Sequence, residues 1–150
     1  MNFDGATFKE IHKAGLGVVI RNSLRQPIAS LSKLVNLPYS SDIVEAMAAT
    51  RAIYFAQEIG LNSFILEGDS EAVIKCLRSD DDSFSLFGHI LAAAKATTET
   101  SCCISFSHIR RLGSFVAHNL AKHAIHVRGF SVWMEDVPPH LQAILSVDNG

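Results

Sequence analysis

The order of apolar and polar positions predicts a chain that begins with strands and then alternates helices with strands. Short runs rich in β-branched and apolar residues, bounded by polar turns, are typical of strands. Five such runs occur, at residues 1–6, 15–20, 27–32, 61–67 and 102–109. A polar turn separates the second run from the third, which predicts an antiparallel hairpin. The segment 34–40, which contains Pro38, is expected to be a loop.

Apolar residues at helical spacing predict four helices. They cover residues 41–59, 70–77, 84–98 and 116–127. Ser40 or Ser41 is expected to cap the first helix, and Gly60 to end it. Asp69 or Ser70 is expected to cap the second. The apolar face of the third helix contains Phe87, Ile90, Leu91 and Ala94.

This order of elements predicts an α/β (α+β) fold with a mixed sheet and helices on its faces. Connections between parallel strands are right-handed, which places the first and fourth strands side by side. Asp4, in the first strand, and Asp69, after the fourth, would then meet at one edge. The first helix would bring Glu45 to the same place. The topology therefore predicts a cluster of three acids.

Acids at apolar positions are costly to bury unless cations or hydrogen bonds compensate them. Several converging carboxylates suggest a hard divalent metal bound by oxygen, and without a metal their mutual repulsion would raise their pKa values. Taken singly, Asp69 can equally be a helix cap and Glu45 a solvated helix residue. Taken together with Asp4, in this order along the chain, they favour metal ligands.

Length and charge narrow the alternatives. The 150 residues suit one domain, expected at residues 1–130, followed by a C-terminal tail at 131–150 that contains Pro138-Pro139. The abrupt start suggests a domain excised from a longer protein. No apolar run spans a bilayer and no leader precedes the first strand, so an intracellular domain without a membrane partner is expected.

The charge and cysteine content exclude several classes of site. A net charge of -2 gives no global basic footprint for nucleic acid, so a polyanion would bind through a local groove and metal. Local basic clusters occur at residues 108–111 and 122–128. The three cysteines form no C-x-x-C pair, which argues against a zinc ribbon or a disulfide framework and favours buried thiols.

Six motifs resemble those of the type 1 ribonuclease H domain, in the reverse-transcriptase-derived branch common in plants. In chain order they are N-F-D-G-A, G-L-G-V-V-I-R-N, E-A-M-A-A-T-R-A-I, L-E-G-D-S-E-A-V-I, S-F-S-H-I-R-R and V-A-H-N-L-A-K-H-A. The resemblance implies a five-stranded mixed sheet in the order 3-2-1-4-5 with flanking helices. It also implies a magnesium-dependent endonuclease that hydrolyses the RNA strand of RNA–DNA hybrids.

The resemblance assigns roles residue by residue. Asp4, Glu45 and Asp69 match the three acids that hold two magnesium ions, with manganese as an alternative. His108 matches a histidine that assists proton transfer or product release, although a phosphate contact would suit it too. His118 stands where many members have a fourth aspartate, so it is either an auxiliary ligand or a locally hydrogen-bonded helix residue. Ser114 replaces the usual asparagine.

These departures keep two other functions open. One is a retroelement-derived domain with weak or no catalysis that binds nucleic acid or a protein partner, which His118, Ser114 and the acidic balance favour. The other is a structural fragment of a larger protein. The sequence does not predict the physiological substrate or the oligomeric state.

Overall fold

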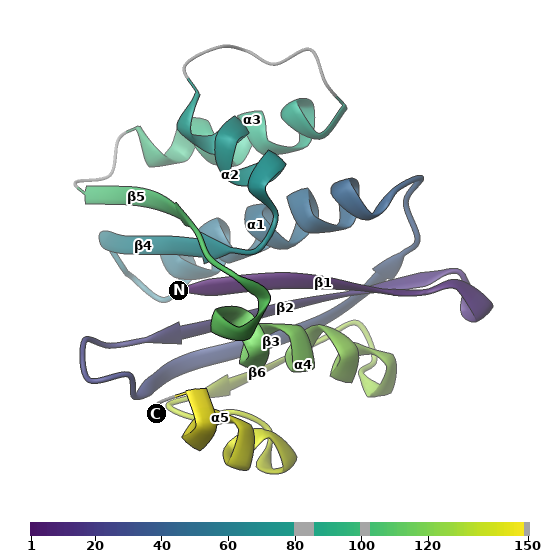
Figure 1. Cartoon of the computed structure of the whole chain (residues 1–150), viewed down its shortest axis with the longest axis vertical. Helices are drawn as coiled ribbons and strands as arrows, with labels where there is room; N and C mark the ends of the chain where they lie inside the picture. The colour runs from purple at the N-terminus through teal and green to yellow at the C-terminus, as the bar shows by residue number, and fades with distance from the viewer. Residues whose placement is uncertain (80–85, 100–102, 149–150) are drawn as a thin grey trace.

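The computed structural model describes residues 1–79, 86–99 and 103–148. A six-stranded mixed sheet lies between two layers of helices (Figure 1). The strands are β1 (Asn2–Phe8), β2 (Lys13–Arg21), β3 (Pro27–Asn36), β4 (Ser63–Gly68), β5 (Cys103–His108) and β6 (Phe130–Met134). The α-helices are α1 (Ser41–Glu58), α2 (Glu71–Arg78), α3 (Leu86–Thr98), α4 (Phe115–His123) and α5 (Gln142–Asp148). None of these helices has the length and apolar character needed to cross a lipid bilayer.

The strand order is β5-β4-β1-β2-β3-β6. Strands β1, β2 and β3 form an antiparallel meander, and β4 runs parallel to both β1 and β5. The expected order of the first five strands is therefore confirmed. The loop expected at residues 34–40 begins later than predicted, because Leu34, Val35 and Asn36 continue the ladder with β2.

Helix α1 covers one face of the sheet with small side chains. The hydroxyl of Ser40 accepts a hydrogen bond from Ile43 N at 3.4 Å, and Gly60 follows the helix with φ +85. Both expected ends are thus confirmed. The buried face is rich in alanine (Ala46, Ala48, Ala49, Ala52 and Ala56). Alanine lets the helix axis approach the sheet closely.

Helix α4 lies on the opposite face, directly against β2. A Cβ atom at Gly15 would overlap the carbonyl oxygen of Ala121, and one at Gly17 would overlap that of Ala117. The hydroxyl of Ser32 donates to Leu120 O at 2.7 Å from the neighbouring strand. Glycine in β2 therefore determines how closely α4, and the histidine it carries, can approach the sheet.

Helices α2 and α3 lie on the α1 side of the sheet (Figure 1). The hydroxyl of Ser70 caps α2 by accepting a hydrogen bond from Val73 N. Of the two expected caps, Asp69 and Ser70, the structure therefore shows Ser70. On α3, Leu91 and Ala94 are buried and Ile90 packs against the core. Phe87 and Cys102, which the sequence analysis also used, lie outside the residues whose side chains are described.

The C-terminal region adds a strand that the sequence analysis did not predict. Residues 131–150 were expected to form a tail, and the sheet was expected to have five strands. Instead β6 pairs with β3, with Trp133 opposite Ser30, and a 3₁₀ helix η4 (Pro139–Leu141) leads into α5. Val137 and Leu141 pack with α4 in a second core. The strand was missed because four of its five residues are apolar and Ser131 alone is polar. Its apolar and polar positions therefore do not alternate as in a half-buried strand.

Candidate metal centre

Asp4 and Asp69 lie at the point where two parallel strands stop pairing. β1 pairs with β4 through Asn2 and Glu67. Asp4 comes two residues after Asn2, and Asp69 comes two residues after Glu67. Because β4 ends at Gly68 while β1 continues, Asp69 lies beside Asp4. The adjacency expected from the right-handed crossover is confirmed.

Glu45 reaches the same point from the second turn of α1. The backbone N–H of Gly5 donates to Asp4 Oδ1 at 2.9 Å and to Glu45 Oε1 at 3.0 Å. A Cβ at Gly5 would lie 2.5 Å from Val44 Cγ1 and 3.1 Å from Glu45 Oε1. Glycine after Asp4 therefore permits the close approach of α1 that brings the glutamate to the strand.

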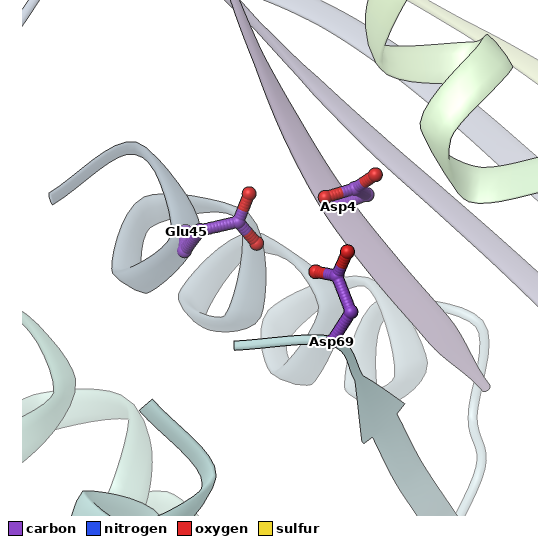
Figure 2. A group of neighbouring side chains, drawn as sticks. All are labelled: Asp4, Glu45 and Asp69. Carbon is purple, nitrogen blue, oxygen red and sulfur yellow. The ribbon is translucent and has the colours of Figure 1, made fainter. Parts of the chain in front are cut away.

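The three carboxylates converge (Figure 2). One oxygen of each of Asp4, Glu45 and Asp69 lies within 4.8 Å of the others. Asp4 is almost completely buried, with 1% of its side chain exposed, and the other two acids are half-buried. Three oxygen donors from three different elements, at this spacing, match the preference of hard divalent cations for carboxylate ligands.

The electrostatics of the cluster are unfavourable without a cation. Burial raises the pKa of Asp4 and the charge of Asp69 raises it further, whereas hydrogen bonds with Glu45 and Gly5 lower it. Burial is also the largest cause that raises the pKa of Glu45, to about 10, followed by the charge of Asp4. The predicted rise is thus confirmed for these two acids, but burial contributes more than mutual repulsion.

A cation would satisfy an atom that the protein leaves without a partner. Glu45 Oε2 is buried and has no hydrogen-bond partner among the described residues. Two facing carboxylates repel each other unless a proton or a cation lies between them. The raised pKa of Glu45 supplies the proton in the metal-free protein. The donor set therefore fits a divalent metal, which would displace that proton.

Comparison with known proteins identifies the family. Residues 2–124 match the protein family described as reverse transcriptase-like. The chain belongs to the reverse transcriptase-like family. No curated protein sequence matches it.

Solved structures show the fold of this reverse transcriptase-like chain. RNase H1 from the archaeon Halobacterium salinarum NRC-1 is 23% identical and has a TM-score of 0.74, covering 83% of this chain and 95% of that one. The N-terminal RNase H domain of Rv2228c from Mycobacterium tuberculosis is 16% identical with a TM-score of 0.71, covering 83% and 90%. LC11-RNase H1, solved with an RNA/DNA hybrid, is 19% identical with a TM-score of 0.72, covering 83% and 94%. The chain has an RNase H-like fold.

His118 of this reverse transcriptase-like domain contacts one of the acids, Asp4, although it is not a member of the three-residue cluster. Its Nδ1 lies 2.8 Å from Asp4 Oδ2, and 20% of its side chain is exposed. The contact is a hydrogen bond within the site, so the ring lies next to the cluster rather than on the outer surface of α4. Whether His118 is also a ligand stays a prediction.

His108 lies at the end of β5, next to Asp69. Its Nε2 is 3.2 Å from the backbone oxygen of Asp69, and the residue is exposed. The imidazole therefore lies beside the backbone of Asp69. Its role in proton transfer or phosphate contact stays a prediction. Ser114, at the other departure from the family pattern, is buried at the start of α4.

One basic residue of the site, Lys122, belongs to the local basic cluster at residues 122–128, which the sequence analysis did not place beside the acids. A cavity of about 450 Å³ beside the acids is lined by Glu45, His118 and Lys122 among others. Lys122 follows His118 by four residues, so both side chains lie on the same face of α4. That spacing was a signal in the sequence. A larger cavity of about 860 Å³ lies at the start of β1 and β4, and none of the three acids lines it.

Proposed function

We propose that this domain is a metal-dependent endonuclease that hydrolyses the RNA strand of RNA–DNA hybrids. The observation that carries the proposal is the convergence of Asp4, Glu45 and Asp69 within an RNase H-like fold. One structural neighbour, LC11-RNase H1, was solved in complex with an RNA/DNA hybrid. We further assign the domain to the plant reverse-transcriptase-derived branch, which His118 supports, and to an intracellular location.

Asp4, Glu45 and Asp69 would hold magnesium or manganese ions. Such ions activate water for attack on a phosphodiester and stabilise charge on the attacking and leaving oxygens. The chain's part is to keep three carboxylates together at a small separation. The Gly5 N–H does this for two of them, and His118 Nδ1 orients the second oxygen of Asp4.

Substrate would enter through the cavity beside the acids. Lys122 gives its wall a positive charge and faces the same space as Glu45. A phosphate approaching three carboxylates meets repulsion, so a cationic side chain at the entrance would favour the strand that is to be cut. His108, on the Asp69 side, would donate a proton to the departing oxygen as the bond to phosphorus breaks, which is a role that imidazole performs in other enzymes.

The test is cleavage of a hybrid labelled separately on each strand, with magnesium or manganese. We expect cuts in the RNA strand only, and none in the matching DNA duplex. Asp69→Asn should abolish cleavage. Glu71→Gln makes the same change of charge two residues away, on an exposed side chain that pairs with Lys75, and should retain cleavage. Absence of cleavage above the Asp69→Asn level would exclude the hydrolase.

A second function is favoured by the hydrogen bond between His118 and Asp4. That bond occupies an oxygen of Asp4 that a fourth acid would have left for metal. The alternative is a catalytically weak or inactive domain that retains nucleic-acid or protein binding. It predicts hybrid binding, measured by fluorescence anisotropy, that depends on salt but not on metal. The enzyme predicts metal-dependent binding that Asp69→Asn weakens.

A further inference from the structure

The outer edge of β6 is unpaired in the described part of the chain. The sheet order places β6 last, with β3 as its partner. The flanking bonds Leu34 N to Gly129 O and Glu135 N to Ile28 O show that odd-numbered residues of this strand face β3. In an antiparallel ladder, the even-numbered residues Phe130, Val132 and Met134 then direct their N–H and C=O groups away from the sheet.

The side chains of the same three residues form an exposed apolar row. Phe130 is 61% exposed, Val132 38% and Met134 57%. They lie on the α1 face of the sheet, because Val132 is paired with Leu31, which belongs to the core under that helix. An edge strand with free backbone groups and apolar side chains is a template for pairing with another strand.

At the other edge of the sheet, a side chain covers one of the outward-facing backbone groups. On β5, Arg78 of α2 donates from its Nε to the outward-facing carbonyl oxygen of Phe106 at 2.9 Å. β6 contains no lysine, proline or other residue that commonly blocks an edge. The two edges therefore differ, and the difference points to a partner strand on β6 only.

We propose that two copies of this chain pair through β6, antiparallel, about a two-fold axis at Val132. In this register Val132 meets its own copy, and Phe130 meets Met134 of the second copy. Outward-facing residues lie opposite outward-facing residues, so each pair exchanges both backbone hydrogen bonds. The side-chain pairs are all apolar, and the sulfur of Met134 meets an aromatic ring.

Charges at the two ends of β6 are complementary in the same arrangement. Arg128 precedes the strand, and Glu135 follows it; both are exposed, and neither has an ion-pair partner among the described residues. Antiparallel pairing about Val132 places the basic end of one strand, Arg128, against the acidic end of the other, where Asp136 lies opposite it and Glu135 next to it, at both ends of the interface. A parallel arrangement would place like charges together. This complementarity is what selects a second copy of the chain as the occupant.

Sedimentation equilibrium over protein concentrations up to about 1 mM tests the pairing, since a single strand pair is a small interface with weak affinity. We expect a reversible dimer. Val132→Lys places two like charges on the axis and should raise the dimer dissociation constant by about tenfold or more. Leu24→Lys adds the same charge at a residue that is 76% exposed in the β2–β3 turn, and should leave the constant unchanged.

A charge exchange tests the antiparallel orientation. Arg128→Glu and Glu135→Arg should each weaken the dimer, and the double variant should regain affinity, because a basic residue at one end of β6 again meets an acidic residue at the other end. A protein that stays monomeric throughout overturns the proposal and leaves the edge to a different partner. A dimer that is insensitive to Val132→Lys, or that the double variant does not restore, overturns it as well. The outcome is independent of whether the domain cleaves hybrids.

Discussion

The acid cluster and the C-terminal extension, residues 130–148, contribute to folding stability in opposite directions. In the acid cluster, carboxylates are buried together, Glu45 Oε2 has no partner among the described residues, and the pKa of Glu45 is raised to about 10. In the extension, Val137 and Leu141 are buried, and Asp136 O and Oδ1 both accept hydrogen bonds. The comparison indicates that the folding free energy comes from regions such as the extension, and that the acid cluster uses part of it to hold charges for metal binding.

Replacing one acid of the cluster should have the largest effect of all the variants, and the effect should be on cleavage and not on stability. Glu45→Gln keeps the shape of the side chain and removes a metal ligand worth several kcal/mol of transition-state stabilisation, so hybrid cleavage should fall by about a thousandfold or more. The melting temperature of the metal-free protein should stay equal or rise, because a buried acid is gone. Cleavage assays and thermal melts in EDTA measure the two effects.

Glu58→Gln is the matched control for that variant. It makes the same substitution at the end of the same helix, where Glu58 forms an exposed ion pair with Arg51 at 2.7 Å. Exposed pairs contribute little, so both cleavage and melting temperature should be nearly unchanged. If Glu45→Gln melts like a core mutant, or still cleaves within tenfold of the wild type, the acid cluster is not the strained metal site described here.

The acid cluster was more predictable from sequence than the extension, for physical reasons. Asp4 and Asp69 follow strands, and the handedness of the crossover makes those strands neighbours. Glu45 lies on the helix that must cover them. The contact of His118 with Asp4 could not be predicted, because it depends on how far Gly15 and Gly17 let α4 approach β2. The β6 strand could not be predicted from alternation, since both of its faces carry apolar side chains.

Truncating a core residue of the extension should have the next largest effect, and on stability alone. Leu141 is buried against α4. Leu141→Ala should cost about 2–5 kcal/mol, or roughly 5–15 °C in melting temperature. Cleavage by the folded protein should change less than about threefold, because β2 also positions α4. Leu24→Ala, at an exposed residue, is the control, and a loss of activity larger than the loss of stability would contradict the separation.

The next largest difference between the two regions should lie in how the free energy of unfolding depends on pH. The folded protein keeps the Glu45 proton up to a pKa of about 10, whereas the unfolded chain releases it near 4.5. The stabilisation is therefore complete below pH 4.5 and is lost as the pH rises toward 10, by at most about 1.4 kcal/mol per pH unit. Burial lowers the pKa of His123. This histidine therefore makes the folded protein less stable only as the pH falls below 6.5.

Melts in EDTA between pH 7 and 9.5 measure this slope. The wild type should lose stability relative to Glu45→Gln across the range, and the difference between the two isolates the carboxyl from other titrating groups. Saturating magnesium should remove the difference in slope, because the metal takes the place of the proton. Parallel melting curves for the two proteins in EDTA would mean that Glu45 is ionised in the metal-free site.

The smallest expected effects come from two serines, one that bonds to the extension and one that bonds to α4, the helix against which the extension packs. The hydroxyl of Ser30 donates to Asp136 O at 2.8 Å, and that of Ser32 donates to Leu120 O of α4 at 2.7 Å. Each serine-to-alanine change should cost about 1 kcal/mol. Ser30→Ala should increase hydrogen exchange only in residues 135–148, whereas Ser32→Ala should loosen α4 and weaken manganese binding through His118. If both variants weaken manganese binding equally, the extension and the acid cluster are one cooperative unit and the contrast between them fails.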